Sequence, residues 1–221
     1  MIIDAVTGER YCALMPTIDT IGDDRAMALI RASVIPDAAA LADTLVAGGI
    51  RAIEFTYTTP EVERHIERAA ATDAVIGAGS VLTPAQARSA LDAGAQFIVT
   101  PGLSPAVAEV AAEAGVPMMM GAFTPSEVMQ ALAQGVWAVK VFPAQTAGPD
   151  HFAHLLGPLP SSRLIASGGV HADNARSFLA AGAYAVTAGS SVVPPEALAD
   201  SDWADIRKRA AAFTAVLHDA L

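Results

Sequence analysis

Lys140 lies in the apolar stretch WAVKVFPA (137–144) and is one of only two lysines in the chain. A charged side chain inside an apolar run must reach solvent, pair with an opposite charge, or take part in chemistry. Because side chains alternate along a strand, Val139 and Val141 on one face leave Lys140 pointing to the other face. Apolar surroundings favour the neutral amine, which can attack the carbonyl carbon of a keto acid. Lys140 is therefore a candidate Schiff-base lysine, whereas Lys208, on a polar terminal segment, is expected to be solvated.

Two further charged residues end apolar stretches and fit the same chemistry. Glu54 in RAIEFTY (51–57) is a candidate general acid and base, because imine formation and C–C cleavage both require proton transfers. Arg31, near the end of AMALIRA (26–32), presents a guanidinium suited to a carboxylate or a phosphate. The structural alternatives are a buried Lys140–Glu54 ion pair, which stabilises poorly because desolvation opposes the attraction, and a salt bridge of Arg31 at the rim.

Two short glycine motifs complete the candidate site. SGG (167–169) and AGS (188–190) each follow an apolar stretch late in the chain. Glycine allows a backbone to approach a ligand closely, and phosphate often binds to backbone N–H groups in such turns. We therefore expect Gly168, Gly169, Gly189 and Ser190 to bind a phosphate.

Elements that position these residues alternate along the chain. Apolar stretches predict eight strands, and Ala/Leu-rich stretches between and after them predict eight helices. The predicted strands are 26–32, 51–57, 74–79, 96–102, 116–122, 136–142, 163–169 and 183–190. The predicted helices are 37–48, 60–70, 84–93, 105–114, 125–134, 149–156, 172–181 and 203–219. Eight repeats favour a closed, compact (β/α)8 TIM barrel over an open doubly wound sheet, with the active site at the carboxyl ends of the strands.

Helix boundaries are also predicted by local chemistry. Thr83, Ser104 and Thr124 each precede a proline and should cap a helix with a hydroxyl. Glycines at 48–49, 94, 115, 135 and 182 fall where helices should end. We expect residues 1–221 to form one barrel domain, with 1–25 as an N-terminal cap.

Composition narrows the class of protein. Hydrophobic residues make up 53% of the 221 residues and charged residues 16%, which is typical of a compact α/β enzyme. A net charge of -10 disfavours binding to nucleic acid or to an anionic membrane. The single cysteine, Cys12, allows no intrachain disulfide, and the five histidines show no metal-binding spacing. Without a signal-peptide pattern or a membrane-spanning apolar run, the sequence predicts a soluble cytoplasmic protein.

Seven stretches resemble one known family over roughly residues 26–195. They are GGIRAIEFTYTTP, VIGAGSVLTPAQ, GAQFIVTPGLSP, GVWAVKVFPA, AGPDHFAHLLGPLP, IASGGVHADN and AGSSVV. The sequence is similar to the class I 2-keto-3-deoxy-6-phosphogluconate (KDPG) aldolases and their 2-keto-3-deoxy-6-phosphogalactonate (KDPGal) and 4-hydroxy-2-oxoglutarate (KHG) relatives. The resemblance implies a (β/α)8 barrel, a Schiff base on Lys140, proton transfer by Glu54 and a homotrimer.

The resemblance also implies roles around the substrate, a phosphorylated keto acid. Pro101 and Phe142 would form walls of the pyruvyl pocket, and Ser80 would lie near the carboxylate. Gly168, Gly169 and Ser190 would hold the phosphate. No cofactor or metal is implied, because the iminium itself accepts electrons.

Three positions depart from the family pattern. Thr58 stands where some members have arginine, so Arg31 would bind the anion. Ser80 replaces the commoner threonine, and Ala188 stands where glycine is frequent.

Competing interpretations remain at the level of sequence. The substrate could be the gluconate or the galactonate epimer, an unphosphorylated acid, or a shorter acid such as 4-hydroxy-2-oxoglutarate. A phosphosugar isomerase or epimerase using Glu54 as a non-covalent base, or a silent sugar-phosphate-binding protein, would use the same barrel. A metal-dependent class II aldolase is disfavoured by the lack of clustered ligands.

Overall fold

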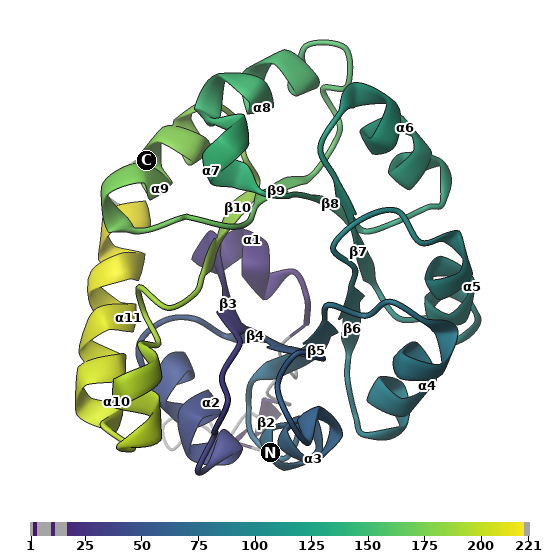
Figure 1. Ribbon diagram of the computed structural model, residues 1–221. Coiled ribbons are helices and arrows are strands. Elements are labelled where there is room, and N and C mark those ends of the chain that lie inside the picture. Colours follow the sequence, from purple (N-terminus) through teal and green to yellow (C-terminus); the bar gives the residue numbers. More distant parts are fainter. Residues whose placement is uncertain (1, 4–9, 12–16, 219–221) are drawn as a thin grey trace.

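The strands of the chain form a closed parallel barrel. The computed structural model describes residues 2–3, 10–11 and 17–218. Within these residues, eight parallel strands close in the order β10-β3-β4-β5-β6-β7-β8-β9, and helices surround them (Figure 1). The barrel strands are β3 (Ala26–Ile30), β4 (Ala52–Thr56), β5 (Val75–Gly79), β6 (Phe97–Val99), β7 (Met118–Ala122), β8 (Ala138–Val141), β9 (Leu164–Ala166) and β10 (Ala185–Ala188). The predicted (β/α)8 barrel is confirmed.

Helices follow the barrel strands as the sequence predicts. The predicted helices correspond to α2 (Ala38–Ala47), α3 (Val62–Ala69), α4 (Pro84–Asp92), α5 (Pro105–Glu113), α6 (Pro125–Ala133), α8 (Pro149–Leu156), α9 (Ala172–Ala180) and α11 (Trp203–His218). Elements that the sequence analysis did not predict are α1 (Thr20–Asp24), α7 (Ala144–Ala147), α10 (Pro195–Ala199) and the antiparallel pair β1 (Ile2–Ile3) and β2 (Arg10–Tyr11). Each of them is shorter than six residues, too short for a hydrophobic period to reveal.

The apolar core forms two layers that follow from strand alternation. Val139 and Val141 belong to the outer layer, between the strands and the helices. Phe97, Met119 and Ile165 belong to the inner layer, which fills the lower part of the barrel. Packing on both faces explains why the barrel strands are apolar almost throughout.

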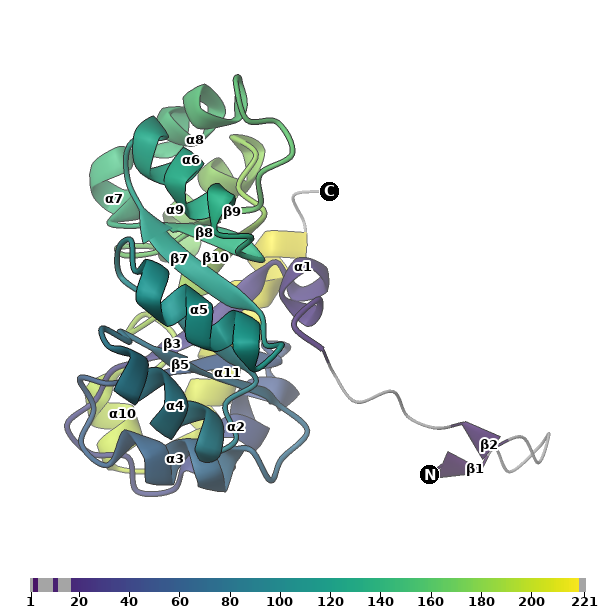
Figure 2. The same ribbon diagram turned by 90° about the vertical axis from the view of Figure 1, so that its right-hand side faces the viewer.

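Helix α1 closes the amino end of the barrel. Ile18 and Ile21 pack into the inner layer beneath the strands, and Figure 2 shows α1 at the end of the barrel that faces away from the viewer of Figure 1. Residues 17–25 are the part of the predicted 1–25 cap that lies at this end of the barrel, and the cap as a whole stays a prediction. Its residues 1, 4–9 and 12–16 lie outside the described residues.

Two of the three predicted hydroxyl caps are formed. Thr83 accepts a hydrogen bond from the backbone N–H of Gln86, and Thr124 accepts one from that of Glu127, each in a capping box. The prediction for Ser104 is wrong: it occupies the N-cap position of α5, but its side chain makes no cap hydrogen bond. The N–H of Val107 instead donates to the Ser104 carbonyl oxygen, at 3.1 Å.

Candidate active site

Lys140 and Glu54 meet inside the barrel above the inner core layer. Lys140 Nζ donates a hydrogen bond to Glu54 Oε1 at 3.3 Å, although 86 residues separate the two in sequence. Lys140 is 4% exposed and Glu54 is 0% exposed. Both side chains point inward because their strand neighbours belong to the outer core layer. The pair lies where the barrel leaves its apolar core and opens toward the mouth.

Glycine in β5 makes room for the Glu54 side chain. A Cβ atom on Gly79 would collide with the Glu54 carboxylate, at Oε1 and Cδ, and with the adjoining Cγ atom. Glu54 Oε2 is buried and has no hydrogen-bond partner among the described residues. A buried carboxylate oxygen without a partner is costly for stability alone, but it is well placed to exchange a proton with a bound molecule.

Above the pair lies a pocket of about 280 Å³. Its walls come from the ends of β3, β8, β9 and β10 and from the segment leading into α10. The predicted site residues that line it are Arg31, Phe142, Gly168, Gly169, Gly189 and Ser190. The pocket therefore brings together six of the ten predicted site residues.

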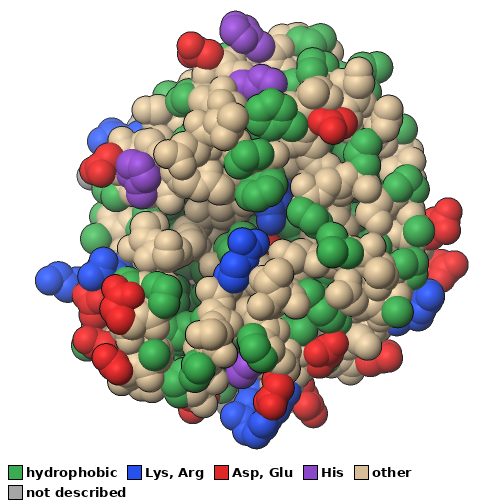
Figure 3. Space-filling model, viewed as in Figure 1, with side chains coloured by type: hydrophobic (Ala, Val, Ile, Leu, Met, Phe, Trp, Pro, Cys, Tyr) green, Lys and Arg blue, Asp and Glu red, His purple; other side chains and the backbone are tan. Residues whose placement is uncertain are grey.

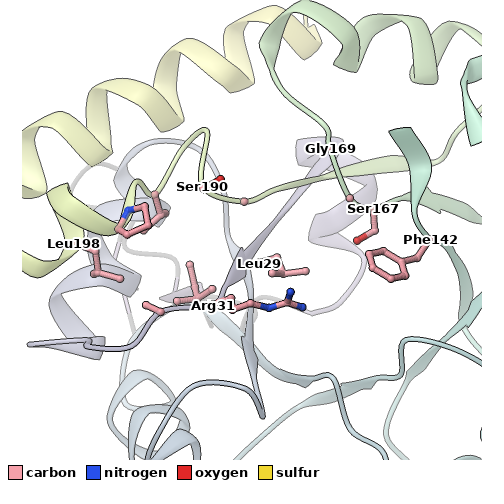
Figure 4. Close-up of a pocket in the computed structure, with 13 residues that line it drawn as sticks. Leu29, Arg31, Phe142, Ser167, Gly169, Ser190 and Leu198 are labelled. Atoms are coloured by element: carbon pink, nitrogen blue, oxygen red, sulfur yellow. The ribbon is translucent and has the colours of Figure 1, made fainter. Parts of the chain in front are cut away.

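Arg31 gives the pocket a positive charge. Its exposed side chain points across the pocket toward Phe142 in Figure 4, and no acidic side chain of the described residues lines the pocket. Lys140 lies just below, with Nζ 5.9 Å from the centre of the Phe142 ring. Figure 3 shows Lys and Arg side chains at the hollow centre of this face, while acidic side chains lie around its rim. The protein as a whole has a net charge of -10, so the positive charge at this pocket is opposite in sign to the rest of the surface and favours an anionic ligand.

The two glycine turns form the opposite side of the pocket. Gly168 and Gly169 have φ angles of 92° and 74°, a conformation that favours glycine. Among the described residues, no backbone carbonyl accepts a hydrogen bond from the N–H groups of Gly168, Gly169, Gly189 or Ser190. These donors are thus available to an anion. A second hollow of about 330 Å³ continues past the same turns to His171.

Ser80 and Pro101 do not line the 280 Å³ pocket. Ser80 is half-buried directly after Gly79 and has a φ of 53°, which is unusual for a residue with a side chain. Pro101 is exposed at the end of β6, where its backbone packs closely against Gly121 of β7. Both therefore belong to the mouth, on the side of the barrel away from the glycine turns.

Two residues of this site, Leu29 and Thr187, were not predicted from the sequence, and Ser167 was named only within the SGG motif, without a role of its own. Leu29 and Ser167 line the pocket, and Thr187 Oγ1 donates to Ser167 Oγ at 3.2 Å. Strand alternation could have found them, because Ser167 lies two residues after the inward-facing Ile165. In the described part of the chain, no group of three His, Cys, Asp or Glu residues is placed to hold a metal ion.

Comparison with known proteins agrees with this geometry. The family model described as "KDPG and KHG aldolase" matches residues 18–209, which include the lysine, the glutamate, the arginine and both glycine turns. The chain belongs to the KDPG and KHG aldolase family. The resemblance predicted from the seven sequence stretches is therefore confirmed.

Relatives in this aldolase family cover most of the chain. A 2-dehydro-3-deoxy-phosphogluconate aldolase of Treponema pallidum is 36% identical over 190 residues, 81% of this chain and 90% of the relative. A probable 2-dehydro-3-deoxy-6-phosphogalactonate aldolase of Rhizobium meliloti is 36% identical over 199 residues, 88% and 92% of the two chains. A KDPG aldolase structure from Legionella pneumophila, with pyruvate captured as a covalent carbinolamine, has 30% identity and a TM-score of 0.81 over 87% of this chain and 95% of that one.

Two further observations lie outside the site. Over the described ranges, no helix combines the length and apolar character needed to cross a membrane. Lys208, the other lysine, is exposed on α11.

Proposed function

We propose that this chain is a class I aldolase that cleaves 2-keto-3-deoxy-6-phospho sugar acids into pyruvate and glyceraldehyde 3-phosphate. The observation that carries the proposal is the buried Lys140–Glu54 pair next to a pocket that is lined by Arg31, Phe142 and both glycine turns. A ligand seated in that pocket would lie close to the lysine and would also reach the glycine turns.

Lys140 supplies the nucleophile. Its neutral Nζ adds to C2 of the keto acid, and loss of water from the carbinolamine leaves an iminium ion. Glu54 Oε1, 3.3 Å from Nζ, removes the ammonium proton and returns it to the departing hydroxyl. The free Oε2 gives the same carboxylate a second position for these transfers.

Bond cleavage follows from the iminium. A base accepts the proton of the C4 hydroxyl, the C3–C4 electron pair moves to form an enamine, and glyceraldehyde 3-phosphate leaves. Protonation at C3 and hydrolysis then release pyruvate and regenerate the amine. We assign both proton transfers to Glu54, directly or through water, because it is the carboxylate nearest the amine.

The remaining predicted residues bind the substrate. Arg31 points toward the Phe142 and Lys140 side and would bind the carboxylate next to C2. Gly168, Gly169, Gly189 and Ser190 would bind the 6-phosphate through their backbone N–H groups.

Phe142 and Pro101 would form walls around the pyruvyl group. Ser80 would donate a hydrogen bond to the carboxylate from the opposite side of the mouth. The chemistry needs no cofactor or metal because the iminium accepts the electrons.

The test is borohydride reduction in the presence of pyruvate, followed by peptide mass analysis. We expect one reduced adduct of pyruvate on the Lys140 peptide and none on the Lys208 peptide, which serves as an internal control. Lys140→Arg should lose both the adduct and turnover. An isomerase or a binding protein would show no adduct, and activity retained in Lys140→Arg would contradict the proposal.

Substrate identity requires a panel of acids. KDPG, KDPGal, their unphosphorylated forms and 4-hydroxy-2-oxoglutarate would be compared by kcat/KM. The glycine turns predict that removing the 6-phosphate lowers kcat/KM, whereas Arg31→Gln should lower it for every acid on the panel.

We further propose that the chain acts as a cytoplasmic homotrimer. Between α5 and α6 lie two apolar hollows of about 290 Å³ each, flanked by Met129, which is 60% exposed, and Leu103, which is 36% exposed. Exposed apolar surface of this kind favours association. A phosphorylated acid does not cross a bilayer unaided, because burying its charge is costly. Analytical ultracentrifugation would measure the mass, with Met129→Glu as the variant expected to dissociate the trimer.

A further inference from the structure

Arg31 lies just beyond the last paired residues of two strands. The β3–β4 register ends with Ile30 opposite Phe55. Among the described residues, the Arg31 guanidinium makes no hydrogen bond or ion pair, so no side-chain partner directs it. Its direction therefore depends on the backbone from which it extends.

Threonine hydroxyls hold both peptide groups that flank the Arg31 Cα atom. Thr56 Oγ1 donates to the carbonyl oxygen of Ile30 at 3.0 Å. Thr59 Oγ1 accepts from the N–H of Ala32 at 3.3 Å. Where the strand ladder stops, these side chains replace the backbone groups that would have continued it.

The threonines are themselves held in place. Thr56 is 0% exposed and Thr59 is 3% exposed. Because the single hydroxyl hydrogen of Thr56 goes to Ile30, Thr58 Oγ1, at 2.9 Å, must be the donor to Thr56 Oγ1. The N–H of Thr59 donates to the Thr56 carbonyl oxygen at 2.8 Å. The network is therefore directional, with Thr56 and Thr59 buried and Thr58 exposed at its outer end.

We propose that Thr56 and Thr59 are positioning residues that aim Arg31 at the carboxylate of the substrate. The inference rests on the proposed function and extends it. Thr56 lies two residues after Glu54 on β4, so one strand sets both the proton-transfer carboxylate and the direction of the guanidinium. Thr58, as the donor to Thr56, then contributes to orienting the arginine on the neighbouring strand.

A double-mutant cycle tests the coupling. T56V/T59V keeps the shape of both side chains and removes their hydroxyls, and R31Q removes the guanidinium. Two neutral hydrogen bonds that orient a charged group predict a rise in KM of about 10-fold, with kcat changed by less than about 3-fold. In the R31Q background the same pair of changes should raise KM less than about 2-fold, because there is no guanidinium left to aim.

Two controls separate positioning from general damage. T56S/T59S keeps the hydroxyls and should have a KM near that of the natural protein. Thr214 has a buried hydroxyl that bonds the carbonyl oxygen of Gly48, far from the mouth, so T214V should lower Tm and leave KM unchanged. If the double valine variant does not fold, the double-mutant cycle is measured with T59V alone and R31Q.

The outcomes are distinct. An equal rise in KM with and without Arg31, or no rise at all, overturns the inference. Absence of a pyruvate adduct on the natural protein overturns the proposed function instead. In that case the Kd for pyruvate is measured by calorimetry for the natural protein, T56V/T59V, R31Q and the combined variant. If the valine changes weaken pyruvate binding equally with and without Arg31, the inference is rejected.

Discussion

Gly79→Ala is expected to inactivate the enzyme by moving Glu54 without altering it. The added Cβ would overlap the Glu54 carboxylate and its Cγ and Cδ atoms. Gly79 lies in β5 without a positive φ, so alanine can adopt its backbone conformation. Because Glu54 is fully buried, its side chain cannot move aside into solvent. The 3.3 Å hydrogen bond from Lys140 must therefore lengthen or break.

The magnitude follows from the role of the carboxylate. A positioned general acid or base contributes about 100-fold to 10,000-fold to rate, so we expect kcat to fall by at least about 100-fold. Overpacking the interior should lower the free energy of unfolding by about 1–3 kcal/mol. For a chain of this size that corresponds to a fall in Tm of about 2–12 °C.

The assay is steady-state release of pyruvate, measured at 25 °C beside Tm. Gly77→Ala is the matched control: it lies on the same strand, and its Cβ would press on the Phe97 ring instead of Glu54. We expect Gly77→Ala to lose comparable stability and to keep kcat within about 5-fold, since overpacking alone does not move the carboxylate. A folded Gly79→Ala protein with normal kcat would refute the reasoning, as would equal loss of kcat in both variants.

Three further expectations follow from local structure. Burial lowers the pKa of His65 from its usual 6.5, so the unfolded chain binds a proton at His65 more readily than the folded chain does. The free energy of unfolding should therefore fall as pH drops through about 6.5. His65→Gln should reduce that fall, as measured by Tm at pH 7.5 and 5.5. Ser80→Gly should raise the free energy of unfolding by up to about 1 kcal/mol, because glycine suits a φ of 53°. The same change should lower kcat/KM through loss of the hydroxyl. An unchanged kcat/KM would show that Ser80 does not belong to the site. Thr124→Ala should lower the free energy of unfolding, measured with denaturant, by about 1 kcal/mol, whereas Ser104→Ala should leave it almost unchanged, because only Thr124 makes its cap hydrogen bond. Equal losses in the two variants would contradict the cap assignment.

Local patterns in the sequence were sufficient for the barrel and for the charged residues of its mouth. Eight apolar stretches separated by helix-start and glycine signals predict eight βα units, because each signal acts within a few residues. Strand alternation likewise predicts that Lys140 and Glu54 point inward. Family resemblance added the roles of Pro101 and Ser80, which no local pattern indicates.

Distances and supporting contacts were decided by the tertiary structure alone. No sequence pattern shows that Gly79 makes room for Glu54, or that the Thr56 and Thr59 hydroxyls hold the peptide groups around Arg31. The capping role expected of Ser104 failed for a similar reason, since its own carbonyl takes the N–H that its hydroxyl was predicted to bind. These contacts depend on how neighbouring strands are staggered when the barrel closes, and that stagger is a property of all eight strands together.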